Sequence, residues 1–284
     1  MNLSFASSFI LKSFENRLQD VFKYPIGIYD SGLGGLNVLL ALYNVMPTRC
    51  FVYFADLRHM PYGNRSSDSI AKLSKDNVKF LEKQGCSIIV SACHTSTTCL
   101  SAMNIVPSKH FVSMEASMYA IIQEAVIQNK ISEVTILATQ RTIDSYVYQN
   151  YLYHTLPDLK VRMIACPSWV IAIESQEENK KRSAVFDILP DIKNSHAIVY
   201  GCTHFSEMDK ILEEELPFEC LRLDPNLALA KALKEQEKTL PLNDVEFNHQ
   251  ICVFTNVSFA PQLENFLKQF PKDCAKIEYV SEFY

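Results

Sequence analysis

The sequence predicts an α/β protein with a doubly wound, mainly parallel sheet. Short apolar runs rich in Ile, Val, Phe and Tyr recur along the chain, and longer polar stretches with helical periodicity separate them. Strands of a parallel sheet are covered on both faces, so they read as continuous apolar runs. The alternation of such runs with segments of helical length is typical of repeated β-α units.

Eight runs are predicted as buried strands. In chain order they are residues 25–30, 51–56, 87–92, 110–115, 134–139, 161–166, 197–202 and 251–256. Parallel neighbours need crossover connections of a dozen or more residues. The stretches 67–83, 116–129 and 168–189 have that length and are predicted as helices.

Residues 1–23 are predicted as a helical extension. Their apolar side chains recur at helical spacing, namely Phe9, Ile10, Phe14, Leu18 and Phe22. No Lys or Arg precedes the apolar part and charged residues follow it directly, unlike a secretory signal peptide. No apolar run is long enough to span a bilayer, so no membrane partner is expected.

Composition narrows the class of function. The chain has 284 residues, of which 48% are hydrophobic and 21% charged, as in ordinary globular proteins. A net charge of −5 provides no basic surface for nucleic acid, so a small-molecule partner is expected. The nine cysteines include no C-x-x-C pair, which disfavours a disulfide scaffold or structural zinc. Reduced thiols and a cytoplasmic location are therefore expected.

Polar and thiol residues follow several of the predicted strands. In doubly wound sheets, ligands gather beyond the carboxyl ends of the strands. The residues at or just after those ends are Asp30, Ser31, Gly32, Asp56, Pro61, Tyr62, Gly63, Cys93, His94, Thr95, Thr139, Thr142, Cys202, Thr203 and His204. Core packing does not require such a set, so we expect a binding site at this edge.

The glycine-rich turn DSGLGGL, residues 30–36, only partly matches a dinucleotide fingerprint. Gly32 and Gly34 fit the first two glycines of G-x-G-x-x-G, but Asn37 occupies the third position. A nucleotide cofactor is therefore disfavoured. Two readings remain, a tight connection between strand and helix or an anion site for a substrate carboxylate. Asp30 could hold or orient a neighbouring proton carrier.

Two cysteine motifs match each other. Cys93 follows the apolar run SIIVSA and Cys202 follows HAIVYG, 109 residues later, each with Thr and His beside it. Such a pair indicates an imperfect internal duplication facing a shared cleft. Inverting a stereocentre by proton transfer requires a base on one face of the carbon and an acid on the other. A thiol has a pKa of about 8.5 and can serve as either, assisted by Asp30 or His204.

Two other chemistries rank lower. A Cys-His hydrolase uses one cysteine and would leave the second matched thiol without a role. A zinc site formed by Cys93, Cys202 and neighbouring histidines is also conceivable from the residue types. A single cysteine in such a motif would more often be a buried structural thiol than a functional one. The matched pair of motifs reverses this preference and favours a functional role.

Several motifs in order resemble the aspartate/glutamate racemase family. They are IGIYDSGLGGLNVL, YFADLRHMPYGNRS, IIVSACHTST, LATQRTIDSYVY, ACPSWVIAIES, IVYGCTHF and LDPNLALA, which together span nearly the whole chain from residue 25. The resemblance implies a cofactor-independent, two-base racemase that interconverts L- and D-glutamate and supplies D-glutamate for peptidoglycan. It also implies two similar α/β domains with the active site between them and, in many members, a homodimer.

The same resemblance assigns roles and boundaries. Cys93 and Cys202 would be the two proton carriers, assisted by Asp30 and His204. The substrate would contact Asp30, Ser31, Pro61, Tyr62, Gly63, His94, Thr95, Thr139, Thr142, Thr203 and His204. Residues 24–117 with 226–284 would form the first domain and residues 118–225 the second.

The chain departs from the family pattern at two positions. His94 stands where the family usually has Asn, and Ala116 stands where a proline usually follows the glutamate. Imidazole is bulkier than a carboxamide and titrates near neutrality. An aspartate or broad-specificity racemase, and a non-racemising relative that binds a ligand, are therefore kept as alternatives.

Overall fold

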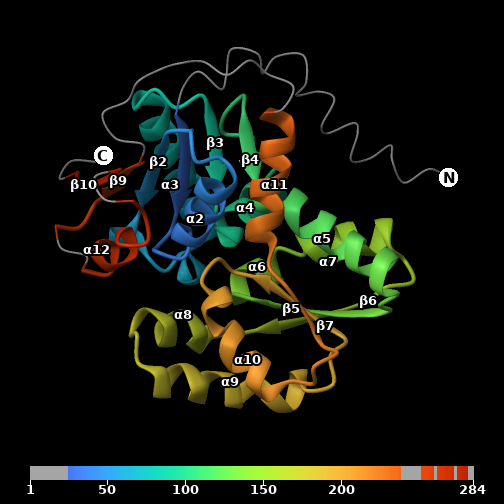
Figure 1. The fold of residues 1–284 in the computed structure, drawn as a ribbon. Helices are drawn as coiled ribbons and strands as arrows, with labels where there is room; N and C mark the ends of the chain where they lie inside the picture. The colour runs from blue at the N-terminus through green and yellow to red at the C-terminus, as the bar shows by residue number, and fades with distance from the viewer. Residues whose placement is uncertain (1–24, 238–250, 259–260, 272–273, 281–284) are drawn as a thin grey trace.

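The structure is a computed structural model that describes residues 25–237, 251–258, 261–271 and 274–280. The predicted extension over residues 1–23 lies outside the described residues. Within them, the chain forms two separate parallel sheets, one above the other in Figure 1. The prediction of an α/β fold with two similar, doubly wound parallel domains is confirmed. The domain boundaries at 117/118 and 225/226 stay predictions.

Sheet A has six parallel strands in the order β10-β9-β2-β1-β3-β4. They are β1 (Ile26–Asp30), β2 (Phe51–Ala55), β3 (Ile88–Ser91), β4 (Phe111–Ser113), β9 (Ile251–Thr255) and β10 (Ala275–Tyr279). Helices α2 (Leu36–Val45), α11 (Pro225–Glu237) and α12 (Pro261–Leu267) cover one face, and α3 (Ser67–Lys83) covers the other.

Sheet B has four parallel strands in the order β6-β5-β7-β8. They are β5 (Glu133–Ala138), β6 (Lys160–Ala165), β7 (Ala197–Gly201) and β8 (Leu221–Leu223). Helices α8 (Pro167–Glu174), α9 (Glu178–Ile192) and α10 (Asp209–Glu215) pack on one face. Helices α5 (Met114–Asn129) and α7 (Val147–Thr155) pack on the other.

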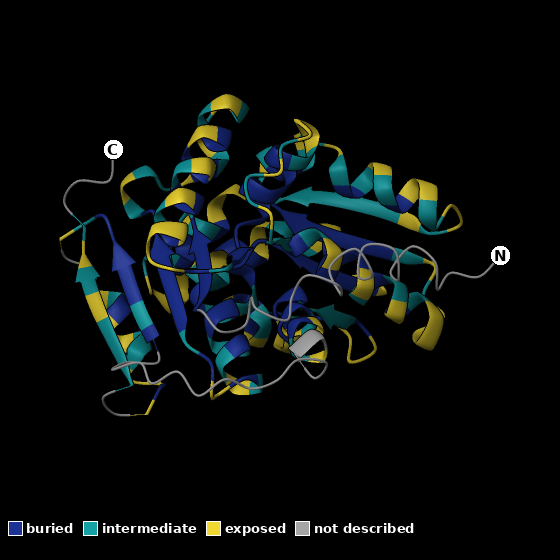
Figure 2. Ribbon diagram, turned by 90° about the horizontal axis from the view of Figure 1, so that it is seen from above, coloured by how far each residue is buried: buried dark blue, intermediate teal, exposed yellow. Residues whose placement is uncertain are grey.

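Burial on both faces accounts for the apolar strands. In Figure 2 the central strands are buried, whereas the outer faces of the helices are exposed. All five residues of β1, β2 and β7 are buried. Each apolar side chain removed from water contributes about 25 cal/mol per Å² of buried surface. Within the described residues, no helix is both long and apolar enough to cross a membrane.

Local signals define α3. Its first turn is capped by Ser66, whose Oγ accepts a hydrogen bond from the Ser69 amide at 3.3 Å. Its apolar side chains at helical spacing, including Ile70 and Leu81, are fully buried. After the helix, Gly85 adopts a φ of 83°, a left-handed conformation that glycine adopts without steric cost. The predicted helix and the observed one have the same bounds.

The strand predicted over 110–115 is shorter in the structure, because α5 begins at Met114. Three further differences concern whole elements. The single helix predicted over 168–189 is wrong, because Gln176 takes a left-handed φ of 57° and separates α8 from α9. Strand β8 was not predicted, because three residues are too short for a recognisable run. Strand β10 was also missed, because it is a half-exposed edge strand whose sequence AKIEY carries charges.

Asp56 ties together segments that border the cavity described below. Its buried carboxylate accepts hydrogen bonds from the Tyr62 hydroxyl at 2.5 Å and the Asn256 amide at 2.6 Å. His59 Nδ1 lies 2.7 Å from the same carboxylate. Tyr62 belongs to the loop after β2, and Asn256 follows β9. One carboxylate therefore holds the loop after β2 against the end of a strand 200 residues away.

Asp56→Ala is expected to lower the free energy of unfolding by about 2–4 kcal/mol. The substitution leaves the Tyr62 hydroxyl and the Asn256 amide without their acceptor, and each unpaired buried group costs about 1–3 kcal/mol. Urea titration provides the measurement. Asp187→Ala is the matched control, because Asp187 is exposed on α9 and its loss should cost less than about 0.5 kcal/mol. Equal stability of the two variants would contradict this role of Asp56.

Candidate active site

Cys93 and Cys202 line the same cavity. The residues around it are Ser31, Met60, Pro61, Tyr62, Gly63, Cys93, His94, Thr95, Thr139, Val170, Cys202, Thr203 and His204. Cys93 follows β3 of sheet A and Cys202 follows β7 of sheet B. The cavity volume is about 20 Å³, comparable to one water-sized sphere. Because an amino acid is larger, the cavity must enlarge to admit one.

Asp30 and Thr142 belong to the expected set but lie one hydrogen bond behind the cavity. Asp30 is fully buried, and its Oδ2 accepts hydrogen bonds from the Gly35 amide at 2.8 Å and the Thr203 hydroxyl at 3.4 Å. Its Oδ1 has no partner among the described residues. Thr142 Oγ1 lies 3.3 Å from Thr95 Oγ1. Of the fifteen residues expected at the sheet edge, eleven line the cavity, and Asp30, Gly32, Asp56 and Thr142 do not.

Cys93 stands at the N-terminus of α4 (His94–Ala102). Its Sγ accepts a hydrogen bond from the Ser96 amide at 3.4 Å and lies 3.6 Å from Ser31 Oγ. Burial, followed by the negative charge of Asp30, raises the pKa of the Cys93 thiol far above its usual range, against the lowering effect of these hydrogen bonds. Cys93 therefore holds its proton at neutral pH.

Cys202 has a different set of neighbours. Its Sγ lies 3.8 Å from His204 Nδ1, and His204 Nε2 lies 2.8 Å from a Glu174 carboxylate oxygen. Burial alone would lower the pKa of His204. The hydrogen bonds to Cys202 and Glu174 and the nearby negative charges outweigh it and raise that pKa well above its usual value. A protonated His204 can donate to Glu174 from Nε2 and to a Cys202 thiolate from Nδ1.

Gly34 allows the two halves of the site to meet. Its amide nitrogen lies 3.2 Å from His204 Nε2, and a Cβ built at this position would stand 2.5 Å from Thr203 Oγ1 and clash with the His204 ring. A protonated Nε2 cannot accept from this amide while donating to Glu174, and the raised pKa of His204 favours the bond to Glu174. Glycine at position 34 therefore permits a close approach of the backbone to Thr203 and His204, which neither interpretation of the turn included.

Three hydroxyl groups form a cluster across the boundary between the sheets. Thr139 Oγ1 lies 3.0 Å from both Thr95 Oγ1 and Thr142 Oγ1. Thr95 belongs to α4, while Thr142 belongs to α6 (Gln140–Asp144), which follows β5. Hydroxyls that donate and accept freely can exchange these bonds for bonds to a bound ligand. This cluster offers adaptable contacts at the cavity wall.

Sequence reasoning missed Glu174, Met60 and Val170. Glu174 ends α8, whereas the expected residues were sought after strands, so only its place in the motif ACPSWVIAIES could have indicated it. Met60 and Val170 are apolar wall residues with no chemical signature. Among the described residues, no group of three His, Cys, Asp or Glu side chains is arranged to hold a metal ion.

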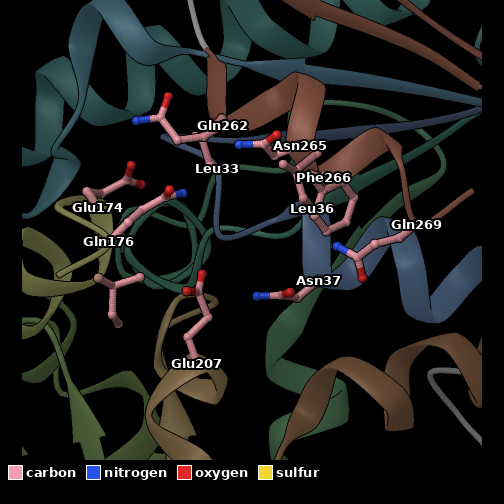
Figure 3. A pocket seen from close by; sticks show the side chains of 11 residues that line it. Leu33, Leu36, Asn37, Glu174, Gln176, Glu207, Gln262, Asn265, Phe266 and Gln269 are labelled. Carbon is pink, nitrogen blue, oxygen red and sulfur yellow. The ribbon is translucent and has the colours of Figure 1, made fainter. Parts of the chain in front are cut away.

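A second cavity shares Glu174 with the first site. It has a volume of about 370 Å³ and lies between the two domains (Figure 3). Its lining is Leu33, Leu36, Asn37, Ile173, Glu174, Gln176, Glu207, Gln262, Asn265, Phe266 and Gln269. The carboxylate that contacts His204 is therefore also part of the wall of a larger and more open space.

Comparison with known proteins places these features in a family. The family model described as Asp/Glu/Hydantoin racemase matches residues 48–233. The chain is 31% identical to the glutamate racemase of Picosynechococcus sp. over 218 residues, which are 75% of this chain and 77% of that one. It is 34% identical to glutamate racemase 3 of Caldanaerobacter subterraneus over 220 residues, 75% of this chain and 78% of the relative.

Solved structures agree with the sequence relatives. The crystal structure of glutamate racemase from Francisella tularensis in complex with D-glutamate superposes with a TM-score of 0.75 and 25% identity. The match covers 90% of this chain and 97% of that one. Because both the family model and relatives of at least 30% identity span most of its length, the chain belongs to the Asp/Glu/Hydantoin racemase family.

Proposed function

We propose that the protein is a cofactor-independent racemase that interconverts L- and D-glutamate by two-base proton transfer. One observation carries the proposal: thiols from two different sheets, Cys93 and Cys202, line one cavity. The reaction needs proton carriers on opposite faces of one carbon. Membership of the racemase family supports the reaction type, and the relatives named glutamate racemase support the substrate.

The neighbours of each thiol suggest its protonation before catalysis. His204 can stabilise a Cys202 thiolate, while burial keeps Cys93 protonated. In one direction, Cys202 removes the proton from the Cα of the substrate and Cys93 delivers its own proton to the opposite face. After this transfer, Cys93 is a thiolate and Cys202 is a thiol. This is the protonation state needed for the reverse reaction. Both directions use the same two groups in exchanged roles.

Asp30 and Glu174 act one step behind the thiols. Asp30 has a carboxylate oxygen without a partner among the described residues, and its charge acts on Cys93. Glu174 holds His204 on the other side. We propose that these carboxylates stabilise the protonated forms of their neighbours, so that each thiol can take up or release a proton during turnover.

The wider role follows from the family. We propose that the protein supplies D-glutamate for peptidoglycan, acts in the cytoplasm and forms a homodimer, as the resemblance implies. The amino acid substrate is a small molecule and no cofactor is implied. An aspartate or broad-specificity racemase is the second candidate, which His94 in place of the family asparagine favours.

Cys93→Ala and Cys202→Ala should each lower kcat for racemisation by at least about 100-fold in both directions, because each removes one of the two proton carriers. Chiral chromatography of reactions started from L- and from D-glutamate measures the effect. Cys99→Ala is the matched control, since Cys99 is equally buried in α4 but does not line the cavity. Racemisation that survives either of the first two substitutions would rule out the two-base assignment.

Glu174→Gln is expected to remove a pH-dependent part of the stability. A histidine whose pKa is higher in the folded protein stabilises the fold fully below its unfolded pKa of about 6.5, and this contribution is lost as pH rises through the folded pKa. The free energy of unfolding of the wild type should therefore fall more steeply above about pH 6.5 than that of the variant. Urea titrations across this range provide the measurement.

Glu177→Gln serves as the control for this experiment, because Glu177 is exposed and its ion pair with Lys180 lies on the surface. Its pH profile should be parallel to that of the wild type. If the Glu174→Gln profile is also parallel, Glu174 does not stabilise protonated His204.

Glutamate should be preferred over aspartate. A difference of one methylene group in a fitted pocket changes kcat/KM by about 10- to 200-fold. A panel of L- and D-amino acids, each followed by chiral chromatography, measures the preference. Equal values for glutamate and aspartate would favour the broad-specificity alternative, and turnover of no amino acid would favour a non-racemising relative.

A further inference from the structure

His94 has an arrangement that the two-base reaction does not require. It is the first residue of α4, its side chain is 2% exposed, and it lines the cavity between the thiols. Its Nδ1 lies 2.6 Å from the Tyr148 hydroxyl oxygen. Its Nε2 is buried and has no hydrogen-bond partner among the described residues. Nδ1 thus has a hydrogen-bond partner in the protein, whereas Nε2 could bond to a ligand.

Counting protons assigns the tautomer of His94. Burial lowers the pKa of His94 to about 3, so the ring is neutral at pH 7 and carries a single N–H. Tyr148 is fully buried, and Nδ1 of His94 is the one hydrogen-bond partner that the described residues give its hydroxyl. If the hydroxyl donates to Nδ1, that bond is satisfied and the ring proton resides on Nε2. Because His94 lines the cavity, a water or a ligand there can accept the Nε2 hydrogen.

The opposite tautomer leaves a buried donor unused. With the proton on Nδ1, the ring would donate to the Tyr148 oxygen, and the phenolic proton would have no acceptor among the described residues. Leaving a buried donor unpaired shifts an equilibrium by about 5- to 150-fold. Tyr148 does not line the cavity, so its unpaired donor could not be met from there. The form with the proton on Nε2 is favoured by up to that factor once a water or a ligand in the cavity accepts from Nε2.

We propose that Tyr148 holds His94 in the tautomer protonated at Nε2, so that His94 donates a hydrogen bond to a carboxylate oxygen of the bound substrate. The proposal rests on the proposed function and names the chemistry of one subsite. An asparagine at this position could either donate or accept. An imidazole fixed in this way can only donate a hydrogen bond at Nε2. It therefore favours binding of a carboxylate, which accepts, over binding of an ammonium group, which donates.

Tyr148 acts as a positioning residue from the side of sheet B. It belongs to α7, which packs on sheet B, while His94 belongs to α4, which follows β3 of sheet A. The rings meet at 70° with centroids 6.0 Å apart. The hydrogen bond therefore joins an element beside sheet A to an element beside sheet B.

The tautomer can be read directly from the wild-type protein labelled with 15N-histidine. The 15N shifts of the two ring nitrogens distinguish a protonated from an unprotonated nitrogen, and His94→Asn identifies the signal by its loss. We expect a protonated Nε2 and an unprotonated Nδ1. In Tyr148→Phe, the share of the Nδ1-protonated form should increase. A wild-type ring protonated at Nδ1 would overturn the proposal.

Kinetics test the consequence for the substrate. Tyr148→Phe should raise KM for glutamate about tenfold, with a smaller change in kcat, because it weakens one contact to the carboxylate. In the His94→Asn background, the same substitution should change KM by less than about threefold, since asparagine does not need the tyrosine. Equal losses in the two backgrounds would show that Tyr148 is only structural. Tyr119→Phe, which keeps the ring stacked on Tyr151, is the control and should resemble the wild type.

The two proposals fail in different ways. If the wild type does not racemise glutamate, the proposed function is wrong, while the 15N spectrum still reports the tautomer. If the wild type racemises glutamate but the ring is protonated at Nδ1, the proposed function stands and the assignment of His94 falls.

Discussion

The close approach of two parallel sheets, carboxyl end to carboxyl end, is the constraint on which the rest of the site depends. The thiols of Cys93 and Cys202 face one cavity because β3 and β7 both end at this boundary. The approach is possible only where side chains are absent, and Gly34 meets that condition beside His204 and Thr203. Hydrogen bonds such as that from Thr203 to Asp30 then join the two walls.

Different surroundings make two chemically identical thiols unequal. Cys93 is buried near Asp30, which keeps its proton in place, whereas Cys202 has His204 and Glu174 beside it. The proposed two-base reaction needs this inequality at the start of each turnover, because one thiol must accept a proton while the other donates one. The cavity between them has a volume of about 20 Å³ and must enlarge before it can hold an amino acid.

Much of this arrangement was predictable, for identifiable physical reasons. Buried parallel strands produce continuous apolar runs in the sequence. Because ligands bind beyond the carboxyl ends of such strands, Cys93, Cys202 and His204 could be predicted as site residues. The edge strand β10 was not predictable in this way, because a half-exposed strand has no such run. The contact of Glu174 with His204 was not predicted, because it depends on how α8 packs beside the segment after β7. The bond between His94 and Tyr148 likewise depends on the meeting of two domains.

The central claim is that two different groups carry the proton on opposite faces of the substrate. It is tested most directly by running the reaction in D2O from each enantiomer and measuring deuterium at Cα in substrate and product during the first few per cent of conversion. With one carrier on each face, the product contains solvent deuterium and the recovered substrate keeps its original hydrogen. Product that retains the original hydrogen, or substrate labelled as fast as product, would contradict the account.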